Sequence, residues 1–104
     1  MWSPLAIERA YEAAEYIARD KPEAALSWLE GLFKSTDKLE TYPRSGTAVP
    51  EIGSAEYRQI VYRRSYRVIY RIEESFISIL TVRSCARLFD PTEIETENEQ
   101  DVEN

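Results

Sequence analysis

Hydrophobic residues recur at helical spacing through the N-terminal part of the chain. Ser3 and Pro4 suit the cap and first turn of a helix. The stripe that follows consists of Ile7, Ala10, Ala14, Ile17 and Ala18. Residues 20–23 (Asp-Lys-Pro-Glu) interrupt this pattern and cap a second helix, whose stripe is Ala25, Leu29, Leu32, Thr36 and Leu39, widened by Leu26, Trp28 and Phe33. We predict a helical hairpin that ends at residues 42–46.

After residue 56 the period changes to that of strands. Segments 57–63, 66–72 and 76–82 are rich in Tyr, Val and Ile, and short polar breaks separate them at 64–65 and 73–75. The pattern predicts a three-stranded antiparallel meander. The fold class is therefore α+β, with an N-terminal helical hairpin packed on a C-terminal sheet.

The length of the second turn decides which side chains share a face of this sheet. With a three-residue turn, one face carries Tyr66, Val68, Tyr70, Ile72, Phe76, Leu80 and Val82, and the other carries Arg67, Ile69, Arg71, Ile77, Ile79, Thr81 and Arg83. A two-residue turn regroups these faces, so both registers stay open. In either register Arg67 and Arg71 project from the same side of their strand.

Charge is unevenly distributed along the 104 residues, whose formal net charge is −6. Residues 57–89 hold seven arginines against two glutamates, whereas residues 90–104 hold seven acids and no base. The chain therefore divides into a domain at 1–89 and an acidic tail at 90–104. Because the tail offers only Ile94 and Val102 as large aliphatic residues, we predict that it is flexible. It either aids solubility or folds back over the arginines.

Composition also restricts the chemistry. With no histidine and one cysteine, the chain has neither the ligands of a structural zinc site nor a histidine-based triad. Ser84 lacks a base to activate it, and Cys85 is predicted to be a buried, inert thiol. We expect no metal and no cofactor. No apolar run is long enough to cross a membrane, no secretory signal is present, and a single cysteine suits the reducing cytoplasm.

The arginines are the main chemical feature. A guanidinium presents a planar fork of donors to phosphates or carboxylates, so arginines on a sheet beside tyrosines could bind a polynucleotide or an acidic protein segment. Alternatively they cover the solvent side of the sheet and pair with helix glutamates. The candidate binding residues are Arg58, Arg63, Arg64, Arg67, Arg71, Arg83 and Arg87.

The order of short motifs resembles the RelE/ParE family of bacterial type II toxins, also called plasmid stabilisation proteins. The matching segments run from Trp-Ser-Pro at 2–4, through Pro-Glu-Ala-Ala at 22–25, Pro43 with Gly46, and Val-Pro-Glu at 49–51, to Tyr-Arg-Val-Ile-Tyr at 66–70 and Ile-Leu-x-Val-Arg at 79–83. The resemblance ends near Leu88. Family members usually begin with a short strand before the Trp-Ser-Pro segment, and that strand is expected to be missing here.

The resemblance implies one of two activities. RelE-like members cleave messenger RNA on the ribosome with basic sheet residues, and Arg58, Arg67 and Arg83 would then bind the phosphate. ParE-like members bind DNA gyrase. Ile60 stands where the nuclease branch has a second basic residue, Ser84 stands where a histidine is common, and no tyrosine follows. Because arginine is a poor proton acceptor at neutral pH, these departures favour a non-enzymatic, ParE-like toxin.

The resemblance also implies partners. The expected ones are a cognate antitoxin and, as target, DNA gyrase or the ribosome with its mRNA, but no membrane. An open sheet edge could accept an antitoxin segment or a second copy of the chain, forming a homodimer. The leading hypothesis is a ParE-like toxin neutralised by its antitoxin. The alternatives are a RelE-type endonuclease and an inactive homologue that only binds antitoxin.

Overall fold

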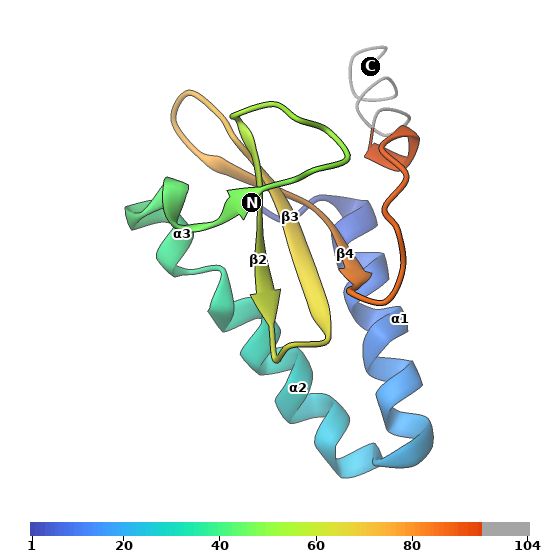
Figure 1. The fold of residues 1–104 in the computed structure, drawn as a ribbon. Helices are drawn as coiled ribbons and strands as arrows, with labels where there is room; N and C mark the ends of the chain where they lie inside the picture. The colour runs from blue at the N-terminus through green and yellow to red at the C-terminus, as the bar shows by residue number, and fades with distance from the viewer. Residues whose placement is uncertain (95–104) are drawn as a thin grey trace.

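The computed structural model describes residues 1–94, which form a helical hairpin on one side of an antiparallel sheet (Figure 1). The helices are α1 (Pro4–Asp20), α2 (Pro22–Ser35) and the short α3 (Lys38–Thr41), followed by a 3-10 turn η1 (Pro43–Ser45). The strands are β1 (Thr47–Ala48), β2 (Tyr57–Tyr62), β3 (Tyr66–Ile72) and β4 (Ile77–Ser84), in the order β1-β2-β3-β4. The α+β hairpin-and-meander prediction is confirmed, with β1 as an additional short strand.

Helix α1 starts where the sequence predicts. The Ser3 hydroxyl accepts a hydrogen bond from the Ala6 amide at 3.1 Å, and Pro4 occupies the first turn. The buried stripe is narrower than predicted: it consists of Ala6, Ala10, Ala13 and Ala14, whereas Ile7 is exposed. The predicted Ala10 and Ala14 are buried, and Ala6 and Ala13 join them in the core in place of Ile7.

Helix α2 contributes larger side chains to the same core. Trp28 and Leu32 are buried, and the Trp28 ring packs edge-on against Tyr62 and Tyr66 of the sheet. Leu26, which the sequence places in the apolar stripe, is exposed instead. Within residues 1–94, none of the helices combines the length and apolar character needed to cross a membrane.

The register of β3 and β4 differs from the three-residue-turn prediction. Ile72 pairs with Ile77 and Tyr70 with Ile79, but Ile69 pairs with Thr81, so a bulge at Leu80 reverses the alternation of β4. As a result Ile77 and Ile79 face the helices, while Leu80 joins a cluster on the opposite face. The predicted sides of Phe76, Leu80, Ile77 and Ile79 are therefore wrong, and Phe76 is half exposed in the turn.

The N-terminal residues pair with the outer edge of β4. Trp2 forms a single parallel bridge with Ile79, supported by hydrogen bonds from the Ser3 amide to the Ile79 carbonyl and from the Ile79 amide to the Met1 carbonyl. Within residues 1–94 no regular strand precedes α1, and this single bridge is the only β-pairing of the N-terminal residues. Beyond Leu80, no strand within residues 1–94 pairs with the outer edge of β4.

After β4 the chain turns back along the sheet (Figure 1). We call residues 85–94 the C-terminal strap, and the sheet face turned away from α1 and α2 the outer face. Phe89 and Ile94 of the strap are buried there with Val49, Ile69 and Leu80. Burying one such side chain contributes about 1.5–3 kcal/mol, so the strap is part of the domain. The packed structure therefore extends past the predicted boundary at residue 89, and the rest of the predicted tail, 95–104, lies outside the described residues.

Candidate partner-binding surface

The structure distributes the seven predicted arginines over four places. Arg58 is opposite Tyr70 in the sheet and so lies on the helix-facing side. Arg67, Arg71 and Arg83 project from the outer face. Arg63 and Arg64 form the tip of the β2–β3 turn, and Arg87 belongs to the strap. The set is thus not one continuous basic surface.

Arg58 fixes the turn before β1. Its guanidinium donates to the Gly46 carbonyl at 2.7 Å. The neighbouring Tyr70 hydroxyl donates to the Pro43 carbonyl at 2.6 Å and accepts from the Gly46 amide at 3.1 Å. Burial raises the pKa of Tyr70 above its usual value, so this hydroxyl stays a donor at neutral pH. Arg58 therefore has a structural role on the helix-facing side.

Arg67 is engaged by an internal carboxylate. Glu51, in the loop before β2, accepts two hydrogen bonds from Arg67 at 2.6 and 3.1 Å, and Gln59 accepts a third at 2.9 Å. The Phe89 amide donates to the same Glu51 carboxylate at 3.1 Å, and the Phe89 ring lies 5.7 Å from the guanidinium. Hydrogen bonding to Arg67 lowers the pKa of Glu51 to about 2. The buried Arg67 thus joins β3, the Glu51 loop and the strap.

These positions bear on the endonuclease alternative. Arg67 and Arg83 are neighbours across β3 and β4, but Arg58 lies on the other side of the sheet. Arg67 is also occupied by Glu51 and is only 8% exposed. The structure therefore does not bring the three arginines together around one phosphate-sized site.

The remaining outer-face and turn arginines have looser surroundings. Arg71 lies over the Tyr57 ring at 5.5 Å and 3.7 Å from the Glu73 carboxylate. Arg63 and Arg64 are exposed and have positive φ angles of 48° and 66°, and the Arg63 guanidinium stacks 5.2 Å from the Tyr62 ring. Exposed arginines in a left-handed turn are available to a partner.

A groove of about 310 Å³ separates α1 from the last part of β4. Its apolar lining comes from Ala13 and Val82 with the rings of Tyr16 and Tyr66, and its polar lining is mainly basic. The polar residues are Arg9, Glu12, Arg83, Ser84 and Arg87. We call this the α1–β4 groove. It is the place where predicted arginines, Arg83 and Arg87, line a concave surface.

The chain itself supplies a carboxylate to two of the groove's arginines, Arg9 and Arg83. Glu93 of the strap accepts two hydrogen bonds from Arg9, at 2.6 and 2.9 Å, and lies 3.6 Å from Arg83. The Thr81 hydroxyl donates to Glu93 at 3.4 Å, and Glu12 accepts from Arg9 at 2.9 Å. The hydrogen bond with Glu93 raises the pKa of Arg9, whose guanidinium, like that of any arginine, is charged at neutral pH.

Sequence reasoning missed Arg9 and Glu93 as a pair. Arg9 is one of several charged residues on the polar face of a helix, and Glu93 lies in the segment predicted to be a flexible tail. They are brought together only because Phe89 and Ile94 fix the strap on the outer face. A local signal did exist, since Asp90 accepts hydrogen bonds from the Thr92 amide and hydroxyl in the manner of a helix cap. The same contacts lower the pKa of Asp90.

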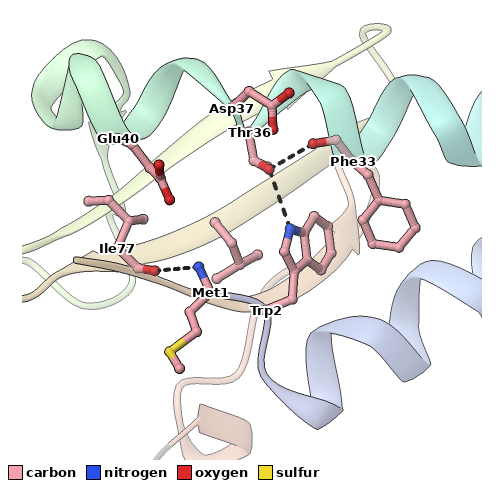
Figure 2. A pocket seen from close by; sticks show the side chains of 8 residues that line it. Met1, Trp2, Phe33, Thr36, Asp37, Glu40 and Ile77 are labelled. Atoms are coloured by element: carbon pink, nitrogen blue, oxygen red, sulfur yellow. Dashed lines mark hydrogen bonds between the residues drawn. The ribbon is translucent and has the colours of Figure 1, made fainter.

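A second hollow, of about 380 Å³, lies between the N-terminus and the end of α2 (Figure 2). The Trp2 indole donates to the Thr36 hydroxyl at 3.3 Å and packs edge-on against Phe33. The Met1 amine donates to the Ile77 carbonyl at 2.8 Å, and Asp37 and Glu40 complete the lining. This hollow is acidic and contains none of the predicted arginines.

The serine and cysteine at the end of β4 do not form a nucleophilic site. Cys85 is exposed, so the prediction of a buried thiol is wrong. The Ser84 hydroxyl accepts a hydrogen bond from the Ala86 amide at 3.2 Å and so shapes the turn into the strap. Among residues 1–94, no three acidic or cysteine side chains gather in a way that could hold a metal ion.

Comparisons with known proteins agree with this fold. A solved structure titled "Chromosomal ParDE TA system from P. aeruginosa" superposes with a TM-score of 0.68 at 18% identity, over 80% of this chain and 90% of that chain. At that identity the match shows the fold. A search of curated proteins gives no significant match. A family model described as the ParE toxin of the type II toxin-antitoxin system, parDE, matches residues 1–89. Because that match covers most of the sequence, the chain belongs to the ParE toxin family of type II toxin–antitoxin systems.

Proposed function

We propose that this chain is the toxin of a type II toxin–antitoxin pair, that it acts by binding DNA gyrase in the cytoplasm, and that a cognate antitoxin neutralises it. Membership of the ParE toxin family supports the toxin role and implies an antitoxin partner. The gyrase target follows from the ParE-like branch of the resemblance, and the arrangement of the arginines favours it over RNA cleavage.

The proposal for antitoxin binding rests on the α1–β4 groove. Its apolar floor suits small aliphatic side chains, while Arg9, Arg83 and Arg87 on its rim suit carboxylates. The outer edge of β4 beyond Leu80, with which no strand of residues 1–94 pairs, adjoins the groove, so an extended segment placed there would also meet backbone donors and acceptors. We therefore assign the groove to an acidic, partly apolar segment of the antitoxin.

The same edge offers an alternative contact between two copies of the chain. A homodimer through β4 would occupy the strand edge that the antitoxin segment needs. The two arrangements therefore compete, and antitoxin binding should dissociate any such dimer. Sedimentation of the free toxin and of the complex measures this directly.

The endonuclease alternative would need a phosphate site and a proton acceptor. The arginines expected to form that site, Arg58, Arg67 and Arg83, do not converge, and two of them have structural partners. Histidine is absent from the sequence. Both points favour a toxin that acts by binding.

Two assays test the proposal. Expression of the chain alone should arrest growth, and co-expression of the small acidic protein encoded beside it should restore growth. Purified toxin should then inhibit supercoiling by gyrase but leave mRNA intact in a translation extract. Cleaved mRNA with active gyrase would assign the RelE-type activity instead. Antitoxin binding without growth arrest would identify an inactive homologue.

A further inference from the structure

The carboxylate of Glu93 lies between α1 and β4, where it contacts Arg9 and Arg83 of the α1–β4 groove. It reaches this place from the C-terminal strap, 84 positions after Arg9 in the sequence. Its two short hydrogen bonds to Arg9 and its 3.6 Å contact with Arg83 show that the cluster can hold a carboxylate. The Glu93 side chain is 16% exposed, so the contact is largely shielded from water.

Arg83 is poorly satisfied by this arrangement. Its Nε is buried and has no hydrogen-bond partner within residues 1–94. Its contact with Glu93, through Nη1 at 3.6 Å, is too long for a hydrogen bond. Arg87, exposed on the same rim, adds another positive charge. The cluster therefore has more donors than one carboxylate can use, and a second carboxylate with better geometry would gain hydrogen bonds from the terminal nitrogens of Arg83, which is partly exposed.

We infer that Arg9, Arg83 and Arg87 form a carboxylate-binding site for an acidic segment of a protein partner, and that Glu93 occupies this site in the free chain and competes with the partner. The inference deepens the proposed function, on which it rests for the identity of the partner. The partner's carboxylate takes the hydrogen bonds of Arg83 and Arg9, and Glu93 is released into solvent.

The lining favours a peptide over a nucleic acid. Ala13 and Val82 give the groove an apolar floor that a sugar–phosphate backbone does not use. A peptide that alternates acidic and aliphatic side chains matches both the arginines and the floor.

Fluorescence anisotropy on the full chain tests the competition. The probe is a labelled decapeptide of alternating glutamate and leucine, and its glutamine–leucine analogue is the uncharged control. Glu93→Gln should bind the acidic probe about fivefold more tightly than wild type at about 50 mM salt, and the gain should fall below about twofold at 0.5 M. The variant Glu93→Gln with Arg83→Gln should lose the gain.

Glu8→Gln is the matched control. Glu8 also pairs with Arg9, at 3.4 Å, but unlike Glu93 it forms no ion pair with Arg83 within residues 1–94, and its replacement changes the net charge equally. If Glu8→Gln tightened binding of the acidic probe as much as Glu93→Gln does, the effect would be one of net charge alone, and the proposal would be overturned. Unchanged or weaker binding by Glu93→Gln would also overturn it, as would a larger gain for an adenylate RNA decamer than for the peptide.

A second variant tests whether Glu93 acts only by holding the C-terminal strap in place. Glu93→Asp keeps the charge but shortens the side chain, so it should bridge Arg9 and Arg83 less well. It should therefore bind the acidic probe more tightly than wild type, but less tightly than Glu93→Gln does. Thermal unfolding of each variant shows whether the strap remains packed. Growth arrest and rescue report on the proposed function alone, because the peptide titration requires neither. Arrest and rescue with no Glu93 effect would refute only the competition.

Discussion

Arg67 and Glu51 form a two-pronged ion pair on the outer face, with Nη2 2.6 Å from Oε2 and Nη1 3.1 Å from Oε1. Both side chains are largely buried, and the Phe89 amide donates to the same carboxylate. An arginine that the sequence marks as a binding residue therefore acts inside the fold. Removing either partner leaves a buried charge, so each residue stabilises the other.

This pair makes the stability of the domain sensitive to acid. The pKa of Glu51 is lowered from 4.5 to about 2 in the folded chain, so the folded state binds fewer protons than the unfolded state. The contribution is fully present above pH 4.5 and is lost as the pH falls towards 2. Urea unfolding should be measured at pH 7, 4.5 and 3. Between pH 7 and pH 3 the free energy of unfolding of wild type should fall by on the order of 2 kcal/mol more than that of Glu51→Gln. Parallel pH profiles for the two proteins would contradict this.

Arg83 and Arg67 should separate binding from stability. Arg83→Gln removes a groove cation with few hydrogen bonds, so it should weaken antitoxin binding about tenfold at low salt with a small effect on unfolding. Arg67→Gln should lower the free energy of unfolding by about 3 kcal/mol, because it leaves the largely buried Glu51 carboxylate without its charged partner. Arg44→Gln, on the exposed turn η1, is the control for charge alone. Titration calorimetry and urea unfolding measure the two effects, and equal binding by all three variants would refute the groove assignment.

Gly46 should tolerate no side chain. A Cβ at this position would lie 2.6 Å from the Gln59 carbonyl oxygen and 2.6 Å from the Tyr70 hydroxyl. Gly46→Ala should therefore lower the free energy of unfolding by about 2 kcal/mol or more, since backbone cannot move aside cheaply. Gly53 gives the comparison: its φ is +72° but its surroundings are open, so Gly53→Ala should cost about 1 kcal/mol. Thermal or urea unfolding of both variants checks the order, and the reverse order would show that the turn at Gly46 can relax.

The limits of the sequence reasoning are clearest in β4. The run Phe-Ile-Ser-Ile-Leu-Thr-Val contains apolar residues of both parities, so periodicity alone cannot locate the bulge at Leu80. That bulge turns Ile77 and Ile79 towards the helices and keeps Thr81 and Arg83 on the outer face. By contrast, the faces of β3 were predictable because Val68 and Tyr70 alternate regularly with Arg67 and Arg71.

The candidate site was harder to predict than the fold. Local patterns locate helices and strands, but the α1–β4 groove depends on contacts between residues far apart in sequence. Arg83 and Arg87 were recognisable as an excess of positive charge. Arg9 and Glu93 were not, because the cap-like contacts of Asp90 with Thr92 do not indicate that Ile94 is buried on the outer face. For the same reason, the sequence analysis grouped Arg58 with Arg67, although the two side chains lie on opposite faces of the sheet.

The turn between β2 and β3 allows a test of whether its arginines are kept for function. Arg63 and Arg64 both have positive φ, and the Ser65 amide donates to the Tyr62 carbonyl at 3.3 Å, as in a type I′ turn. Such turns favour Asn-Gly, and each non-glycine residue in this conformation costs about 1 kcal/mol. The double variant Arg63→Asn with Arg64→Gly should therefore raise the free energy of unfolding by about 1 kcal/mol, after the lost stacking of Arg63 on Tyr62 is offset. If the tip contacts gyrase, the more stable protein should also inhibit supercoiling less. A stable variant with full inhibition would exclude the tip from the target interface and leave the outer face and the groove as the surfaces that bind partners.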